Sequence, residues 1–130
     1  MKQSIAYITL VVRNYDEAIA FYTGALGFAL LEDTALGGGK RWVRVAPRGA
    51  SETALLLAQA DDDTQRARIG DQTGGRVGFF LHTDDFDRDH AAMIARGVRF
   101  LEAPRREAYG TVAVFEDLYG NRWDLLEPAA

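Results

Sequence analysis

The 130-residue sequence contains no cysteine, which excludes disulfide bonds and thiolate chemistry. It has no run of roughly 18 apolar residues, so no membrane-spanning helix is expected. Met1 and Lys2 lead directly into a strand pattern, without the charged and then apolar segment of a secretory leader. We therefore expect a cytoplasmic protein with no membrane partner.

The sequence also lacks an excess or a stripe of positive charge. The net charge is −4, and the arginines at 66, 68, 105 and 106 lie in separate polar stretches. Nucleic acid is therefore not an expected partner. With 48% hydrophobic and 26% charged residues, the composition fits a single compact domain over residues 1–130.

What the sequence does contain is one pattern repeated twice. In the first copy, an apolar strand pattern at residues 5–12 is followed by a helical pattern that ends at Gly27. In the second copy, a strand pattern at residues 77–83 is followed by a helical pattern that ends at Gly97. Two copies are too few for a stacked solenoid, so we expect them to pair with each other.

Matching positions in the two copies can be assigned by their spacing. Tyr15 corresponds to Phe86, and in the last strand of each copy Leu55 corresponds to Asp124. The separation falls from 71 to 69 residues along the copy, as single-residue insertions or deletions in turns would produce. Each copy is expected to run strand, helix, strand, strand, strand, with a polar connector at residues 61–75.

Local signals mark the element boundaries. Asn14 is the expected N-cap of the first helix, and Asp84 or Asp85 that of the second. Three consecutive glycines at 37–39 predict a hairpin turn. In the first strand, alternation predicts that residues 8, 10 and 12 face the helix while residues 7, 9 and 11 face the other way.

This organisation resembles the vicinal oxygen chelate superfamily, which includes glyoxalase I, bleomycin-resistance proteins and extradiol dioxygenases. The most specific marks are residues 16–22 running into Leu26, Gly27 and Phe28, and the closing segment 117–125. Leu118 departs from the proline usual in the closing turn, and Asp124 stands where a glutamate is usual.

The resemblance implies an α+β fold with two paired βαβββ modules, at about residues 1–60 and 76–130. In the family, the modules form a cup-shaped half-open barrel that holds a small ligand and often a divalent metal. The resemblance also implies a homodimer.

The metal-dependent members carry His or Glu at four matched positions, which here are Tyr7, Leu55, Gly78 and Asp124. Leu55 and Gly78 have no side-chain donor, and a divalent ion needs about three donors. We therefore expect no metal of the family type and no other cofactor.

His82 shares the strand alternation of Gly78 and is expected to face the cup. With Asp124 it forms a candidate catalytic pair for proton transfer near neutral pH. The alternative interpretation is a half-buried histidine with a structural hydrogen bond. His90, on the face of the second helix that carries Phe86, is expected to be structural.

The remaining candidates suggest ligand binding. Tyr7 and Thr9 share the concave face, and Trp42 or Arg44 are expected to join them, together with the matched positions Leu55 and Gly78. Binding of a small organic molecule without the family metal is thus the predicted function. The alternatives are a lyase or dioxygenase-type enzyme built around His82 and Asp124, and a domain that binds a partner protein.

Overall fold

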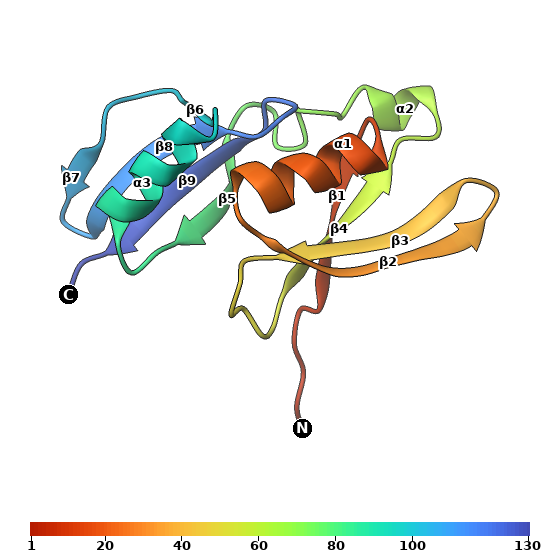
Figure 1. Ribbon diagram of the computed structural model, residues 1–130, viewed down its shortest axis with the longest axis horizontal. Helices are drawn as coiled ribbons and strands as arrows, with labels where there is room; N and C mark the ends of the chain where they lie inside the picture. The colour runs from red at the N-terminus through yellow and green to blue at the C-terminus, as the bar shows by residue number, and fades with distance from the viewer. The chain divides into compact units, whose positions relative to one another are not determined.

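The computed structural model describes all 130 residues, and the chain divides into two compact units, Met1–Ile69 and Gly70–Ala130. Each unit consists of one mixed sheet with a helix between its first two strands. The fold is therefore α+β with two βαβββ-like modules, as the sequence predicts (Figure 1). None of the helices has the length and apolar character needed to cross a bilayer.

The first unit contains a four-stranded sheet in the order β1-β4-β3-β2. Strand β1 runs parallel to β4, and the other neighbours are antiparallel. The elements are β1 (Tyr7–Val12), α1 (Tyr15–Ala20), the π-helical turn η1 (Phe21–Ala25), β2 (Ala29–Gly37), β3 (Lys40–Ala46), β4 (Ala54–Gln59) and the short α2 (Asp63–Arg66).

Helix α1 begins and ends where the local signals predict. The Asn14 side chain accepts a hydrogen bond from the Glu17 backbone N–H at 3.0 Å, which satisfies one of the unpaired donors at the helix start. The helix continues through η1, whose wider turn is closed by the bond from Leu26 N–H to the Phe21 carbonyl. Gly27, at φ 72°, then ends it in a left-handed conformation.

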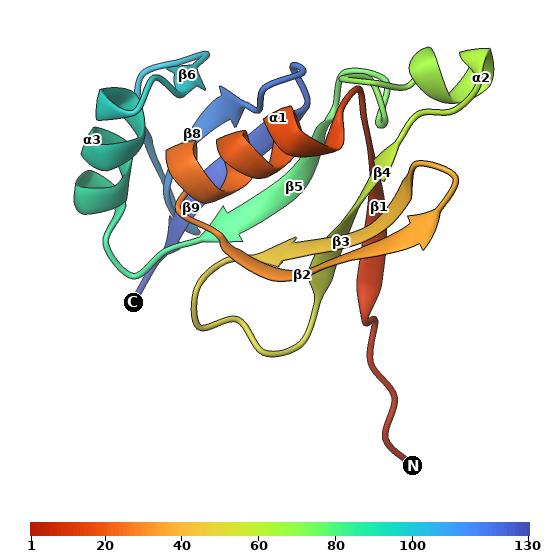
Figure 2. The ribbon, with the colours of Figure 1, turned by 45° about the vertical axis from the view of Figure 1, so that its right-hand side comes forward.

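One face of the first sheet packs against α1 (Figures 1 and 2). Leu10 and Val12 on β1 are fully buried on this face, while Tyr15, Ala18 and Tyr22 are buried on the helix. Ile8 was expected to face the helix, but it is 46% exposed. Burial rises along β1 toward its junction with α1, so the helix shields only the far half of the strand.

The second unit contains strands in the order β5-β9-β8-β6, with β5 parallel to β9. A further short strand, β7, pairs with β8 and was not predicted. The elements are β5 (Val77–His82), α3 (Phe86–Ala95), β6 (Arg99–Phe100), β7 (Arg105–Glu107), β8 (Gly110–Glu116) and β9 (Arg122–Pro128).

Helix α3 repeats the design of α1. Asp85, one of the two expected N-caps, accepts a hydrogen bond from the Arg88 N–H at 3.1 Å. Phe86 and Met93 are buried, whereas Ile94 is 51% exposed. In a helix of 3.6 residues per turn, Ile94 points about 100° away from its neighbour Met93, which is enough to leave it at the solvent side.

Stacked and edge-on rings fill the space between α3 and its sheet. They form a continuous series of contacts, with centroid separations of 4.4 to 5.7 Å, through Phe86, His90, Phe100, Phe115, Trp123 and Phe79. His90 lies within this series, between Phe86 and Phe100, and therefore has a packing role. Trp123 is 4% exposed and lies on the helix-covered face of the sheet, opposite to its neighbour Asp124.

The closing turn between β8 and β9 is organised by Asp117, a carboxylate that is only 5% exposed. Its Oδ1 accepts the backbone N–H groups of Tyr119 and Asn121, each at 3.0 Å. Its Oδ2 accepts the Asn121 amide at 2.9 Å and the Trp123 indole N–H at 3.4 Å. These hydrogen bonds explain why the closing segment carries an aspartate here, because a buried carboxylate needs several donors to offset its desolvation.

Candidate functional site

The two units can be aligned by a hydrogen bond that each makes at the start of its helix. Gln59 Oε1 accepts the Tyr15 N–H at 3.1 Å, and Glu127 Oε1 accepts the Phe86 N–H at 2.7 Å. Gln59 and Glu127 are 68 residues apart, so the position in the first unit that corresponds to Asp124 is Leu56.

The matching of Leu55 with Asp124 from spacing alone was therefore shifted by one residue. A shift of one residue in a strand moves a side chain to the opposite face. Leu55 pairs with Ile8 and Val45 in the sheet and lies on the face that α1 covers, where it is 9% exposed. Leu56 lies on the other face.

The face of the first sheet turned away from α1 brings together four of the predicted ligand-binding residues. Thr9, Leu56 and Arg44 are aligned across β1, β4 and β3, and Trp42 lies two residues from Arg44 on the same side. Tyr7 lies two residues from Thr9. We call Tyr7, Thr9, Trp42, Arg44 and Leu56 the open face of the first unit.

Aromatic and cationic groups on this open face contact one another. The rings of Tyr7 and Trp42 meet edge to face, with centroids 5.9 Å apart. The guanidinium carbon of Arg44 lies 5.2 Å from the centroid of the Tyr7 ring. Tyr7 is 46% exposed, so the cluster remains accessible to a ligand.

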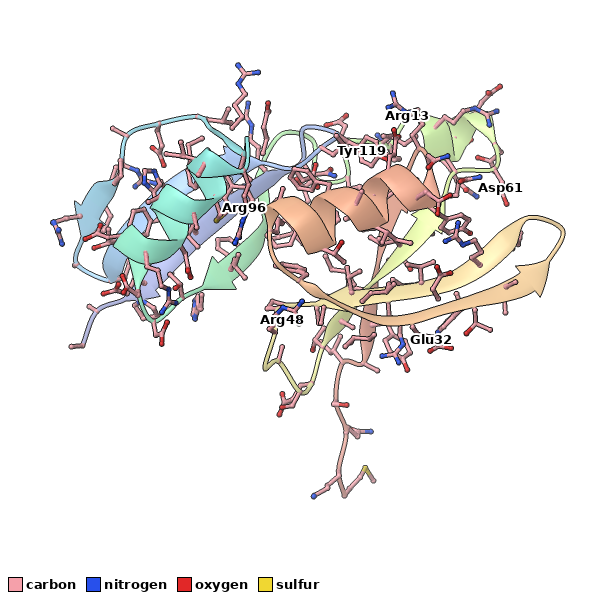
Figure 3. All side chains as sticks on the ribbon, in the orientation of Figure 1. Arg13, Glu32, Arg48, Asp61, Arg96 and Tyr119 are labelled. Carbon is pink, nitrogen blue, oxygen red and sulfur yellow. The ribbon has the colours of Figure 1, made fainter.

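Arg44 is held in place by Glu32 on β2, which the sequence analysis did not single out. Arg44 Nε lies 3.1 Å from Glu32 Oε1, and Thr34 donates a hydrogen bond to the second oxygen of Glu32 at 3.1 Å. Figure 3 shows Glu32 on the side of the β2–β3 hairpin away from α1. Because Glu32 and Arg44 pair across the hairpin, their opposite charges were the signal that could have identified Glu32.

A cavity of about 410 Å³ opens beside this face. The pairing of β3 with β4 ends at Val43 and Leu57, and the tip of the β2–β3 hairpin diverges from β4 (Figure 2). Trp42 and Leu56 line both the cavity and the open face, and Tyr15 and Gln59 line it from the α1 side. Its volume lies within the range of roughly 300–1,000 Å³ typical of small-molecule pockets.

Some polar groups in the cavity wall already form hydrogen bonds or ion pairs within the protein. The Arg41 backbone N–H donates to the Tyr15 hydroxyl at 3.2 Å, which ties the hairpin to α1. Lys40 and Asp61 form an ion pair at 3.6 Å between the hairpin and the segment after β4, where Figure 3 labels Asp61. Both side chains are more than half exposed, so this pair contributes little to stability.

In the second unit, Asp124 lies on the face of the sheet turned away from α3. Its neighbours across the strands are Phe80 on β5 and Val114 on β8. Phe80 is 62% exposed and was not singled out from the sequence, although it shares the alternation of His82. The second unit therefore also presents an aromatic ring beside a polar group on its uncovered face.

Asp124 is electrostatically unusual. Burial raises the pKa of its carboxyl group, Arg105 acts to lower that pKa, and Glu102 acts to raise it further. Its Oδ1 is buried and has no hydrogen-bond partner. A buried acceptor without a donor costs about 1–3 kcal/mol, so this position is maintained at some cost to stability.

His82 lies two residues along β5 from Phe80, the residue that pairs with Asp124. His82 pairs with Leu126, is exposed, and has no hydrogen bond or ion pair with Asp124. Gly78 is the bulge residue between two consecutive pairs of the β5–β9 ladder. A Cβ at this glycine would come within 2.7 Å of the Thr73 methyl group, so Thr73 occupies the space that a longer side chain would need.

The residues at the family's metal positions do not fit a divalent ion. No group of three or more His, Asp or Glu side chains converges in the structure as a metal site would require. Of the four matched positions, only Asp124 carries a carboxylate.

Comparison with known proteins places this architecture in a family. The sequence model of the Glyoxalase/Bleomycin resistance protein/Dioxygenase superfamily matches residues 4–125. The chain belongs to this superfamily. One relative, a protein of Shewanella frigidimarina, is 56% identical over 98% of this chain and 95% of its own length.

Solved structures also resemble the chain over nearly its whole length. UcmS2 superposes with a TM-score of 0.85 at 29% identity, covering 98% of this chain and 99% of its own. TnmS3, an antibiotic-binding protein from Streptomyces sp. CB03234, superposes with a TM-score of 0.79 at 32% identity, covering 98% of each chain. The comparisons thus include a protein with a small-molecule ligand.

Proposed function

We propose that this superfamily member binds a small aromatic organic molecule on the uncovered face of its first sheet, without the divalent metal of its metal-dependent relatives. The observation that carries the proposal is the cluster of Tyr7, Trp42 and Arg44 on the open face of the first unit. Homodimer formation, inferred from the family resemblance, remains a prediction.

The cluster has the chemistry of an aromatic-binding surface. Tyr7 and Trp42 offer ring faces and edges for stacking, and Arg44 offers a cation that packs on a ring. Glu32 restricts the guanidinium orientation, which reduces the entropy that binding would otherwise cost. The adjoining cavity shares Trp42 and Leu56 with this surface and provides space for the rest of a ligand.

Two further lines of support concern the family. The antibiotic-binding neighbour TnmS3 shows that this fold can serve as a binding protein. The donor set at the matched metal positions also does not suit a divalent ion, which separates this chain from the metal-dependent members.

We favour binding over the alternative of a lyase or dioxygenase-type enzyme. That alternative depends on His82 and Asp124 acting as a pair, and the sheet register sets Phe80, not His82, beside Asp124. A general base must lie within hydrogen-bonding reach of the proton it removes, directly or through one water. Catalysis at this pair remains a prediction from sequence.

The experiment is a thermal-shift screen with naphthalene derivatives, followed by isothermal titration calorimetry of any compound that raises the melting temperature. A ligand that binds only the folded state at about 100 times its Kd stabilises it by about 2.7 kcal/mol. We expect Trp42→Ala to weaken binding by roughly two- to twelvefold, since an aromatic contact contributes about 0.5–1.5 kcal/mol.

The control is Leu118→Ala, which removes an exposed apolar side chain from the closing turn of the second unit. It should leave both affinity and melting temperature close to those of the unchanged protein. Equal affinity of Trp42→Ala and the unchanged protein would contradict the assignment of the open face.

A further inference from the structure

The unsatisfied oxygen of Asp124 is informative about the ligand. Buried polar atoms in folded proteins almost always have a hydrogen-bond partner. The described chain has one buried side-chain oxygen or nitrogen without such a partner, and it is Asp124 Oδ1. An exception of this kind requires an explanation, and a donor on a bound ligand would supply the missing partner.

The charged groups near Asp124 are already engaged with one another. Arg105 Nε donates to Glu102 at 2.8 Å, and a terminal nitrogen of Arg105 donates to Glu107 at 2.9 Å. The second oxygen of Glu102 accepts the Val114 backbone N–H at 2.9 Å. The guanidinium that acts on Asp124 is therefore engaged by two other carboxylates, and the local charge is three carboxylates against one guanidinium.

The internal repeat shows that the fold does not need a carboxylate at this position. The first unit has Leu56 in the corresponding place, between strands of the same order and on the same uncovered face. An apolar side chain thus satisfies the packing of this strand position. Asp124 instead places a carboxylate with an unpaired buried oxygen at this position, an arrangement that costs stability in general. We infer from this a role in recognition.

We propose that Asp124 Oδ1 accepts a hydrogen bond from a small molecule bound on the uncovered face of the second sheet, so that this face selects aromatic ligands carrying an O–H or N–H donor over ligands without one. Phe80, exposed beside Asp124, contacts the apolar part next to that donor. The inference rests on the proposed function, because it adds a chemical requirement to the same class of small aromatic ligand.

The test compares three naphthalene probes by isothermal titration calorimetry at neutral pH. 2-Naphthol carries a neutral O–H donor, 2-naphthylmethylamine carries an ammonium donor, and 2-methoxynaphthalene carries no donor. We expect the unchanged protein to bind at least one donor probe roughly tenfold or more tightly than 2-methoxynaphthalene, as a hydrogen bond to a charged acceptor implies.

Two substitutions separate acceptor chemistry from charge. Asp124→Leu copies the residue of the first unit and removes the acceptor, so it should abolish the preference for donor probes while leaving the protein folded. Asp124→Asn keeps one carbonyl acceptor but removes the charge. A preference for 2-naphthol that persists in Asp124→Asn identifies a neutral donor, whereas a lost preference for 2-naphthylmethylamine identifies a cationic one.

Asp87→Asn is the matched control, because it changes the net charge equally at an exposed position in the first turn of α3. It should bind all three probes as the unchanged protein does. A donor preference that survives in Asp124→Leu would overturn the assignment of Asp124.

The outcomes also separate this inference from the proposed function. Equal binding of all three probes to the unchanged protein would overturn the role of Asp124 while supporting aromatic binding. Failure of every probe to bind would contradict the proposed function itself and, with it, the requirement for a donor on the ligand.

Discussion

Gln59 and Glu127 occupy equivalent places in the two units, since each side-chain oxygen accepts the first backbone N–H of the helix in its own unit. Both residues lie near the end of the last strand, parallel to the strand that precedes the helix. In each unit, this hydrogen bond therefore ties the start of the helix to the last strand, which is itself paired with the first strand. It fixes the position of the last strand relative to the helix start.

The hydrogen bond between Glu127 and the helix start should contribute to stability. Glu127→Ala should lower the free energy of unfolding by about 1–2 kcal/mol, because it leaves a partly buried helix-start N–H without its acceptor. Urea unfolding followed by circular dichroism measures the change. Glu127→Gln keeps the acceptor and should cost much less, so equal losses for the two variants would contradict the proposed role of the oxygen.

Asp117 should be among the most sensitive turn residues. Asp117→Ala removes the acceptor for four donors in the closing turn, and we expect a loss of about 2–3 kcal/mol in the free energy of unfolding. Asp71→Ala, an exposed aspartate of the same unit, is the control and should change stability by less than about 0.5 kcal/mol. A small effect of Asp117→Ala would show that the turn is held by its backbone alone.

Asp89 should contribute to stability in a pH-dependent way. The hydrogen bond from the Arg88 side chain, aided by one from the Thr83 hydroxyl, holds the pKa of Asp89 below its usual value. Since the folded pKa lies below the unfolded one, this contribution is present above the unfolded pKa of about 3.9 and is lost as pH falls through the folded pKa.

The substitution Asp89→Asn should therefore lower stability at neutral pH, by no more than about 1 kcal/mol because the pair is partly exposed. The difference from the unchanged protein should start to shrink below the unfolded pKa of about 3.9 and vanish as pH falls through the lowered folded pKa, because both forms are then neutral at this position. Melting temperatures measured across the acidic range up to neutral pH test this, and a difference independent of pH would point to lost packing instead.

Asp124 should show the opposite dependence. Burial raises the pKa of Asp124, so the folded state binds its proton more tightly than the unfolded state does. The associated stability is present below the unfolded pKa and is lost as pH rises through the raised folded pKa.

At neutral pH, Asp124→Leu should consequently be more stable than the unchanged protein, by about 1 kcal/mol. The gain should diminish as pH falls through the raised folded pKa and be smallest below the unfolded pKa of about 3.9, where the carboxyl group is protonated in both states. Urea midpoints at acidic and neutral pH provide the measurement, and Asp87→Asn provides a charge control. A destabilised Asp124→Leu at neutral pH would mean that the carboxylate has a structural partner.

Much of the fold could be predicted because its signals are local. The N-cap at Asn14 and the helix end at Gly27 were predicted correctly from residue chemistry that depends only on near neighbours. The glycine turn at 37–39 joins β2 to β3 as expected. Period-2 alternation within single strands likewise groups Tyr7 with Thr9 and Trp42 with Arg44, and the strand pairing places both groups on one face.

The positions that differed from prediction depend on pairing between distant strands. Leu55 was matched with Asp124 by counting residues, but only the bonds of Gln59 and Glu127 to the helices show that Leu56 is the counterpart. A bulge at Gly78 likewise interrupts the register of β5 on β9, and the strand neighbour of Asp124 is Phe80. Counting cannot locate such shifts, because a strand has no internal mark of its register.

The sequence alone thus determined the order of the main strands and helices, the internal repeat and the superfamily, since these depend on periodicity, caps and turns that each segment carries within itself. The short elements α2 and β7 were not predicted. Tertiary structure decided which side chains meet. The contact of Tyr7 with Trp42 and Arg44, the engagement of Arg105 by two glutamates, and the unpaired oxygen of Asp124 all arise from strand register and burial. These contacts depend on strand pairing and burial rather than on any single segment, so they exist only once the sheets have formed.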